Sequence, residues 1–295
     1  MSAKKIAALD IGGTQIKAAL FEDGVLRERR ETNTLAAEGP ASLLRRSGDL
    51  IADFGAPDAV GISTAGQVDV DTGVIRYAND NLPGYTGTNV RGYFSARFAC
   101  PCAVLNDAMA AALGEGARGA AQGCADYICV TYGTGVGGGI VLGNRPYYGA
   151  GGSANPLIGG LITHPELTVR GDPFAGSYER SASATALVAA AKRLDPTLTN
   201  GRVVFAQLAD PNVQAVVDHW LDEVAAGLLS LLHLFNVPCL VLGGGVLEQP
   251  YVIEGLRARV REEAIPGFET ARVAAALLGN AAGLYGAMQS AAQLL

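Results

Sequence analysis

The sequence lacks the features of a protein that binds nucleic acid or crosses a membrane. Its 295 residues include 22 Lys and Arg against 28 Asp and Glu, a net charge of −6, and contain no block rich in Lys and Arg. A nucleic-acid surface needs a basic stripe, and no apolar run approaches the length that spans a bilayer. The amino terminus reaches Asp10 too soon for a secretory signal peptide. We therefore expect a cytoplasmic protein whose partners include neither nucleic acid nor a membrane.

Histidine is scarce, and the cysteines are too few and too irregular to form a disulfide framework. The five cysteines are an odd number without disulfide-like spacing. A structural zinc site needs four good ligands, but the chain has only three histidines and no Cys cluster. We predict free thiols and no zinc for these residues: Cys100, Cys102, Cys124, Cys129, Cys239, His164, His219 and His233.

Three common nucleotide-binding signatures are also missing. The P-loop ending in Gly-Lys-Ser/Thr is absent, and no His-Arg-Asp or Asp-Phe-Gly of a protein kinase occurs. The pattern Gly133-x-Gly135-x-x-Gly138 matches the dinucleotide fingerprint in letters. That fingerprint must open a helix, whereas a β-type run at residues 139–143 follows here. A dinucleotide site is therefore disfavoured.

The chain does contain two turns rich in glycine and threonine, each between apolar strands. One lies in Leu9–Thr14, and the other lies about a hundred residues later in Thr131–Gly139. Glycine lets the backbone approach a phosphate closely, and threonine adds a hydroxyl donor. Asp10 lies where it could hold a metal ion bound to those phosphates. The pair favours an ATP-dependent phosphotransferase, and the alternative is two ordinary hairpin turns.

The pattern of secondary structure occurs twice along the chain. Strands are predicted at 6–10, 15–21 and 25–31, followed by a helix and further strands, and the pattern restarts at Tyr127. With 49% hydrophobic residues, the chain can form sizeable cores. We expect two α/β lobes around a cleft, each on a mixed sheet. Residues 1–116 form one lobe, with a helix at about 280–293 packing back on it, and residues 117–279 form the other.

Between the lobes' regular elements, residues 149–180 are rich in Gly, Pro and Ser and show little periodicity. Such a long irregular stretch inside a compact domain is more often functional than idle. We therefore expect this stretch to contribute to the site.

The order and spacing of these motifs resemble the ROK family (repressor, open reading frame, kinase) over nearly the whole chain. The resemblance is carried by Leu9–Lys17, Gly61–Asp69, Asn81–Gly84, Leu105–Ala108 with Ala111–Glu115, Thr131–Gly139 and Leu242–Val246. It implies an actin-like ATPase fold, a duplicated ribonuclease H-like unit whose two lobes close over ATP-Mg and a sugar. Repressors of the family carry an N-terminal helix-turn-helix, for which the strand beginning near Lys5 leaves no room.

The resemblance makes Asp107 the catalytic base that accepts the proton of the attacking sugar hydroxyl. Phosphoryl transfer needs positioning, charge neutralisation and one proton acceptor, which a carboxylate can supply. Asp107 could also be a helix N-cap, and both roles can hold together. By the same resemblance Asn106 would bind a sugar hydroxyl, with capping of the turn as its alternative. Gly66 and Asn81 would contact the sugar or serve only as turn residues.

The resemblance also assigns the nucleotide site. Asp10 would hold Mg²⁺, through water because this ion dehydrates reluctantly. Backbone N–H groups of the two turns would bind the ATP phosphates, and a later glycine pair would lie under the adenosine. These ATP contacts are Gly12, Gly13, Thr14, Gly133, Thr134, Gly135, Gly243 and Gly244. The alternative for the last pair is a strand-to-helix turn without a ligand.

The chain departs from the family at one sugar-binding segment. Most members carry Gly-Glu-x-Gly-His, where residues 155–164 of this chain have no Glu in any register, and the zinc-binding Cys cluster is gone. Tyr178–Ser183 resembles a later glutamate motif, so Glu179 would be a sugar ligand or else a solvated charge. His164 could replace the lost histidine or be simply exposed.

We therefore predict an enzyme that uses ATP to phosphorylate the primary hydroxyl of a hexose, glucose or a related sugar. Alternatives are a kinase for a substituted sugar such as a β-glucoside, N-acetylmannosamine or fructose, a small-carboxylate kinase of the same superfamily, and a non-catalytic sugar sensor. We expect a small-molecule sugar as the partner and a homodimer as the assembly.

Overall fold

A computed structural model describes residues 3–149 and 155–295. The chain divides into two compact units. The first contains Met1–Gly123, Gly139–Pro156 and Asn280–Leu295, and the second contains Cys124–Gly138 and Leu157–Gly279. The lobe boundary predicted at residues 116–117 stays a prediction. Within the described ranges, no helix is both long enough and apolar enough to cross a membrane.

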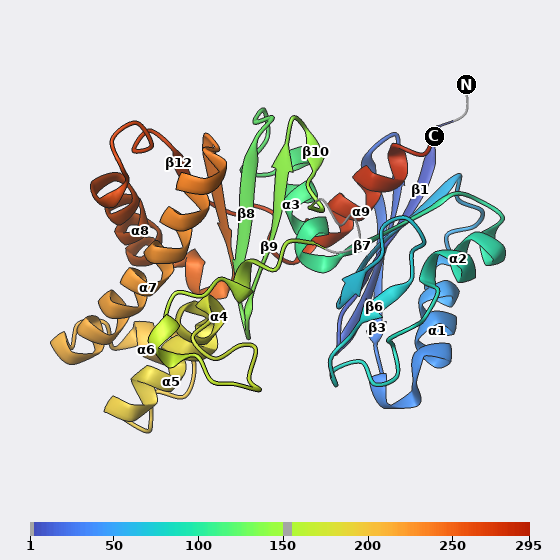
Figure 1. The fold of residues 1–295 in the computed structure, drawn as a ribbon. Coiled ribbons are helices and arrows are strands. Elements are labelled where there is room, and N and C mark those ends of the chain that lie inside the picture. Colours follow the sequence, from blue (N-terminus) through green and yellow to red (C-terminus); the bar gives the residue numbers. More distant parts are fainter. Residues whose placement is uncertain (1–2, 150–154) are drawn as a thin grey trace. The chain divides into compact units, whose positions relative to one another are not determined.

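The first unit contains a five-stranded mixed sheet of order β3-β2-β1-β4-β7 (Figure 1). Its strands are β1 (Lys5–Ile11), β2 (Gln15–Glu22), β3 (Val25–Asn33), β4 (Ala59–Thr64) and β7 (Cys102–Asn106). β1, β2 and β3 are antiparallel, whereas β4 and β7 run parallel to β1. The sequence prediction of these strands is confirmed.

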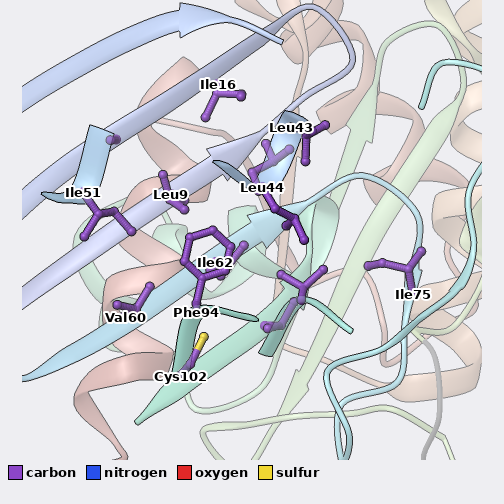
Figure 2. Close-up of a cluster of buried hydrophobic side chains, with 14 of the residues drawn as sticks. Leu9, Ile16, Leu43, Leu44, Ile51, Val60, Ile62, Ile75, Phe94 and Cys102 are labelled. Carbon is purple, nitrogen blue, oxygen red and sulfur yellow. The ribbon is translucent and has the colours of Figure 1, made fainter. Parts of the chain in front are cut away.

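Both faces of this sheet are buried at β1, which is apolar at almost every position, whereas the edge strand β3 is mostly exposed. Alternate residues of a strand point to opposite faces. Leu9 and its alternates join a core with α1 (Pro40–Ala52) and α2 (Val90–Phe98), shown in Figure 2. Ile6 and Ala8 join a second core with α9 (Ala282–Ala292). A near-continuous hydrophobic run is typical of a strand covered on both faces.

Helices α3 (Asp107–Arg118) and α9 approach each other closely through small residues. A Cβ atom added at Gly286 would lie 1.7 Å from the carbonyl oxygen of Ala110, and one at Gly114 would lie 2.2 Å from that of Ala282. Only glycine fits such contacts. The two helices hold the end of β7, where α3 begins.

The region from residue 66 to residue 84 is less regular, and the sequence predicts it as loops. The structure adds a small antiparallel pair there, β5 (Gln67–Val68) and β6 (Ile75–Tyr77). Short 3-10 turns complete the first unit at η1 (Ala36–Glu38) and η5 (Gly279–Ala281).

The second sheet repeats the order of the first, as β10-β9-β8-β11-β12. Its strands are β8 (Tyr127–Tyr132), β9 (Val136–Leu142), β10 (Arg145–Pro146), β11 (Cys239–Gly243) and β12 (Arg272–Ala275). β11 lies parallel to both β8 and β12. Each glycine turn therefore joins the first two strands of its sheet, as the repeated sequence pattern predicts.

The second unit contains five helices and three 3-10 turns. These are α4 (Tyr178–Ala182), α5 (Ala184–Leu194), α6 (Gly201–Ala206), α7 (Pro211–Phe235), α8 (Pro250–Glu263), η2 (Ile158–Gly160), η3 (Pro165–Leu167) and η4 (Gly245–Glu248). The long helix α7 buries the face that the spacing of its apolar residues predicts. It begins after the N-cap Asp210 and ends at Asn236 in a left-handed conformation.

Candidate active site

The first glycine turn, between β1 and β2, is anchored by one buried threonine. The N–H of Gly12 donates to the carbonyl of Gln15 at 3.0 Å, and the Gly12 carbonyl accepts the Thr34 hydroxyl at 2.6 Å. Thr34 is fully buried, and its own N–H donates to the Thr14 carbonyl at 2.9 Å. Gly13 and Thr14 are exposed at the tip. Sequence analysis missed Thr34, whose role follows from its position at the end of β3.

Asp10 lies near the end of β1, and the strand register places its partners beside it. Its neighbours across the sheet are Lys17 on β2 and Ser63 on β4. The Ser63 hydroxyl donates to Asp10 Oδ1 at 2.7 Å, and Lys17 Nζ lies 3.8 Å from Oδ2. A Cβ atom added at Gly283 would lie 2.9 Å from Oδ1. The sequence prediction named neither Lys17 nor Ser63.

The junction of β7 and α3 carries Asn106 and Asp107. Asn106 is the N-cap: its Oδ1 accepts the N–H groups of Ala108 at 3.0 Å and Met109 at 3.4 Å. Asp107 is the first residue of the helix. The alternative of Asp107 as the N-cap is therefore wrong, because Asn106 occupies that position, although Asp107 Oδ1 also accepts the Ala108 N–H at 2.8 Å.

Asn106 also holds the Asp107 carboxyl group in place. Its Nδ2 donates to Asp107 Oδ1 at 2.8 Å and to the Gly66 carbonyl at 2.9 Å. Its Oδ1 accepts a further bond from Asn155 Nδ2 at 2.8 Å. An amide has two N–H donors, and both are used here. Asn106 thus positions Asp107 and the Gly66 loop, and its contact with a sugar stays a prediction.

The environment raises the pKa of Asp107 to about 6. Desolvation is the main cause, and the negative charge of Asp10 adds to it, while hydrogen bonds from the Ala108 N–H and from Asn106 act in the opposite direction. The residue remains accessible to water, so crowding by protein atoms rather than full enclosure explains the shift. A carboxylate whose pKa lies nearer neutrality is a better general base than an ordinary aspartate.

Two loop residues complete the group of predicted residues in the first unit. Gly66 has φ of +100°, and a Cβ atom there would lie 2.7 Å from the Tyr77 carbonyl oxygen, so the position requires glycine. Asn81 lies beside the first glycine turn, since a Cβ atom added at Gly13 would be 3.4 Å from Asn81 Cβ. The structure thus gathers all these residues near the carboxyl ends of β1, β4 and β7, where α/β sheets commonly bind ligands.

The second glycine turn, between β8 and β9, is braced by a carboxylate. Glu179 Oε2 accepts the N–H of Val136 at 3.0 Å, and a Cβ atom at Gly135 would lie 2.1 Å from the same oxygen. The N–H of Ala184 donates to the Gly133 carbonyl at 3.1 Å. Gly133 and Thr134 are exposed. Glu179 therefore supports this turn, and its predicted contact with a sugar stays a prediction.

The glycines after β11 lie against the end of β8. Gly244 has φ of +115°, and a Cβ atom there would lie 2.1 Å from the Tyr132 carbonyl oxygen. Gly243 is paired with Thr131 in the parallel register of β11 and β8. This close approach places residues 243–245 next to the turn that begins at Gly133.

A pocket of about 540 Å³ opens beside Gly133 and Gly245. We call it the nucleotide-turn pocket, and its other lining residues include Asn200, Arg202, Phe205 and Gln249. The sequence prediction did not name these four residues. The sequence did contain one signal for this region, the pair Asn200-Gly201 at the start of a helix. Asn200 caps α6 by accepting the Val203 N–H at 3.1 Å.

The similarity to known proteins decides the family. A sequence model of the ROK family matches residues 6–293. This chain belongs to the ROK family. A ROK hexokinase from Thermus thermophilus has a similar structure, with a TM-score of 0.85, 32% identity and coverage of 98% of each chain.

Two further relatives of this ROK protein are similar over almost their whole length. A ROK glucokinase from Streptomyces griseus, solved in complex with glucose and AMPPNP, has a TM-score of 0.80 and 30% identity, covering 98% of this chain and 99% of its own. A β-glucoside kinase from Listeria innocua is 27% identical and matches over 96% of each sequence. The prediction of the actin-like ATPase fold is confirmed.

The first unit offers one carboxylate ligand for the predicted magnesium ion. Asp10 offers carboxylate oxygens, the ligand type that Mg²⁺ prefers. The negative charge of Asp10 raises the pKa of Asp107, and a divalent cation would relieve that repulsion. The residues of this ROK protein therefore fit a magnesium ion beside the first glycine turn.

His164 does not face a metal. Its Nδ1 lies 2.9 Å from Glu166 Oε1 and its Nε2 lies 2.7 Å from Glu223 Oε2. The hydrogen bond with Glu223, followed by that with Glu166, raises the pKa of His164. Over residues 3–149 and 155–295, no three His, Cys, Asp or Glu side chains are grouped to hold a metal ion. The absence of zinc stays a prediction.

Proposed function

We propose that this protein is an ATP-dependent kinase that phosphorylates the primary hydroxyl of a hexose. One observation carries the proposal: the Asp107 carboxyl group is fixed by Asn106 at a strand-to-helix junction, with its pKa raised to about 6. It lies in the same unit as Asp10 and the first glycine turn. The names hexokinase, glucokinase and β-glucoside kinase of its relatives support a sugar as the substrate.

Asp107 acts as the general base. Its Oδ1 accepts bonds from Asn106 and from the Ala108 N–H, which orients the group and directs Oδ2 toward a substrate hydroxyl. As the hydroxyl oxygen bonds to the γ-phosphorus, the bond from that phosphorus to the β–γ bridging oxygen breaks, ADP leaves, and the hydroxyl proton passes to Oδ2. The transition state of such a transfer spreads charge over the phosphoryl oxygens, so positioning and electrostatic stabilisation supply most of the rate enhancement.

The glycine turns bind the phosphates. Gly13 and Thr14 in the first turn, and Thr134 in the second, are exposed and can donate to phosphate oxygens, whereas the N–H of Gly133 already donates to the Gly135 carbonyl at 2.9 Å. The nucleotide-turn pocket next to Gly133 and Gly245 is in place for the adenosine. Asp10 would hold Mg²⁺, which neutralises phosphate charge when bound. Lys17, 3.8 Å from Asp10, keeps that carboxylate paired.

Glucose or a close relative is the proposed sugar, with loose discrimination at its first and second carbons. The glutamate that most family members place there is missing, and Asn155 begins the segment that replaces it. Asn155 bonds to Asn106 at 2.8 Å, so it supports the base rather than forming a charged sugar contact. A site that does not bind a hydroxyl cannot strongly reject analogues that lack it.

A coupled assay of ATP turnover tests the proposal. We expect sugar-dependent ADP release for at least one of glucose, 2-deoxyglucose, mannose, N-acetylmannosamine, fructose and cellobiose. A preference for glucose over 2-deoxyglucose above about 10⁴-fold, the range of sites built to bind a hydroxyl, would contradict loose discrimination. Sugar binding without turnover for every compound would indicate a sensor instead. Homodimer assembly stays a prediction, to be tested by light scattering.

A further inference from the structure

A second pocket in the second unit, of about 340 Å³, has no assigned role. Its walls come from α4, α5, α7 and the turn η3; the three helices contact one another, as Figure 1 shows. We call it the helix pocket, and the lining residues used below are Ser177, Arg180, Leu187, Arg193, Trp220 and Glu223. None of its lining residues belongs to the nucleotide-turn pocket. It is therefore a separate site.

Ser177 supplies a buried hydroxyl group without a partner. The residue occupies the N-cap position of α4, where a serine usually accepts a backbone N–H, but its side chain makes no such bond. It is fully buried, and its Oγ has no hydrogen-bond partner among the described residues. Buried polar groups are normally paired. A polar atom of a bound molecule would satisfy this hydroxyl group once the pocket wall opens slightly at Ser177, because its Oγ has almost no accessible surface in this conformation.

Two arginines give the helix pocket a positive rim. Arg180 has one long contact within the described chain, 3.8 Å to Asp172, and Arg193 forms no ion pair with any described residue. The acid in the lining, Glu223, is already engaged by His164 at 2.7 Å and by His219 at 3.8 Å. Guanidinium groups bind carboxylate and phosphate with two parallel hydrogen bonds. The rim therefore favours an anionic group.

The floor of the helix pocket is apolar. Leu187 and Trp220 are almost fully buried and line it. Small-molecule sites are typically apolar pockets of this size with a few polar groups that fix orientation. The ligand that fits has an apolar body against Leu187 and Trp220 and an anionic group at the arginines.

The wall of the helix pocket is linked to the second glycine turn. Glu179, between the lining residues Ser177 and Arg180, accepts the Val136 N–H in that turn. Trp220 Nε1 donates to the carbonyls at the end of α4, Ala182 at 3.0 Å and Ser183 at 3.1 Å. A ligand that favours one position of α4 would shift the turn with it, since ligands change conformational populations by binding one state better.

We propose that the helix pocket binds a small organic anion with an apolar part, and that this binding changes the affinity of the second glycine turn for nucleotide. The binding site stands independently of the proposed function, whereas the coupling to nucleotide rests on it. The chain has a single tryptophan, Trp220, which lines this pocket, so tryptophan emission reports on changes in its surroundings.

The first experiment titrates phenyl phosphate into the protein and follows Trp220 emission, with calorimetry as a second measurement that needs no optical change. We expect saturable binding of phenyl phosphate. Binding should be at least tenfold weaker for phenol, which lacks the anionic group, and for inorganic phosphate, which lacks the apolar part. The proposal is overturned if calorimetry detects no phenyl phosphate binding, or if phenol binds as tightly.

Variants then locate the binding. Arg193→Ala and Ser177→Ala should each weaken phenyl phosphate binding by about tenfold, the scale of a hydrogen bond to a charged group. Lys192→Ala is the matched control, because Lys192 is the adjacent exposed cation on α5 and does not line the pocket. Equal effects of Arg193→Ala and Lys192→Ala would show that the anion binds elsewhere or only through general charge.

The coupling is measured without turnover, as the affinity for AMPPNP with and without saturating phenyl phosphate. We expect a change of about fivefold or more, the lower end of typical couplings, and the same factor when the order of ligands is reversed. Arg193→Ala should abolish the change. An unchanged AMPPNP affinity would overturn the coupling, and a protein that binds phenyl phosphate but phosphorylates no sugar would contradict the proposed function alone.

Discussion

The two glycine turns have similar sequences, but the protein holds them in different ways. The first is held by its neighbouring strands, through Thr34 and the backbone. The two carboxylates of the same unit have other partners, since Asp10 accepts from Ser63 and Asp107 accepts from Asn106. The second is held by a carboxylate, Glu179, which lies 43 residues from the N–H that it accepts. The carboxylates of the first unit are thus left for the proposed catalysis, with Asp107 as the base, whereas Glu179 of the second unit maintains the shape of its turn.

The strongest test of this comparison is Asp107→Asn. The side-chain oxygen of asparagine can still accept from Asn106 and from the Ala108 N–H, so the structure should persist while the base is lost. We expect sugar-dependent turnover to fall by about 10² or more, the scale of general-base catalysis, with little change in nucleotide affinity. Steady-state kinetics and a nucleotide titration measure the two effects; retained turnover would show that Asp107 is not the base.

The same substitution should raise stability at neutral pH. Because the folded pKa of Asp107 lies above its ordinary value of 3.8, at about 6, the folded protein binds the proton more tightly and loses stability as the pH rises through that window. Asp107→Asn removes this cost. We expect a higher Tm than wild type at pH 8 and a difference that disappears below about pH 4. A lower Tm at pH 8 would contradict the raised pKa.

The pH dependence of catalysis tests the different roles of Asp107 and Glu179. A base with a pKa of about 6 is charged above that pH, so kcat/KM should fall by about tenfold per unit as the pH drops below it. Glu179→Gln should show the same fall in kcat/KM at low pH, because Glu179 supports the turn and does not accept the proton of the substrate hydroxyl. If Glu179→Gln lost this pH dependence, Glu179 rather than Asp107 would be the base.

Glu179 itself should have a moderate effect that depends on the replacement. Glu179→Ala leaves the buried Val136 N–H without a partner, which costs about 1–3 kcal/mol, and we expect the KM for ATP to rise about tenfold. Glu179→Gln keeps an oxygen acceptor and should stay within about threefold of wild type. A loss above 10²-fold in kcat/KM for glucose in Glu179→Gln, with the KM for ATP unchanged, would make Glu179 a sugar ligand.

The smallest effect is expected from Thr34→Val, which keeps the shape of the side chain and removes the bond to the Gly12 carbonyl at 2.6 Å. A lost hydrogen bond of this kind costs about 1 kcal/mol, so the KM for ATP should rise a few-fold. Thr34→Ser, which keeps the hydroxyl, is the control. Equal behaviour of the two variants would show that the hydroxyl does not hold the first turn.

The candidate site could be predicted where its residues lie at the ends of strongly patterned elements. Asp10, Asn106 and Asp107 end or follow apolar strands, and the parallel order of those strands brings them together. Thr34 and Ser63 were missed because each is an ordinary polar residue whose role depends on a partner far along the chain. The contact between Asn155 and Asn106 joins residues 49 positions apart, and nothing in either local sequence indicates it.

The sequence by itself determined the strands, the long helix α7 and the two glycine turns, because each depends on side-chain periodicity or backbone freedom within a few residues. Only the tertiary structure decided that Asn106 rather than Asp107 caps α3 and that Glu179 supports the second turn. It also decided that the Ser177 hydroxyl, in a pocket lined by two arginines, has no partner among the described residues. The physical reason is that a polar side chain can satisfy its hydrogen bonds in several ways. Which partner it takes depends on the segments that the folded core brings within about 3 Å of it.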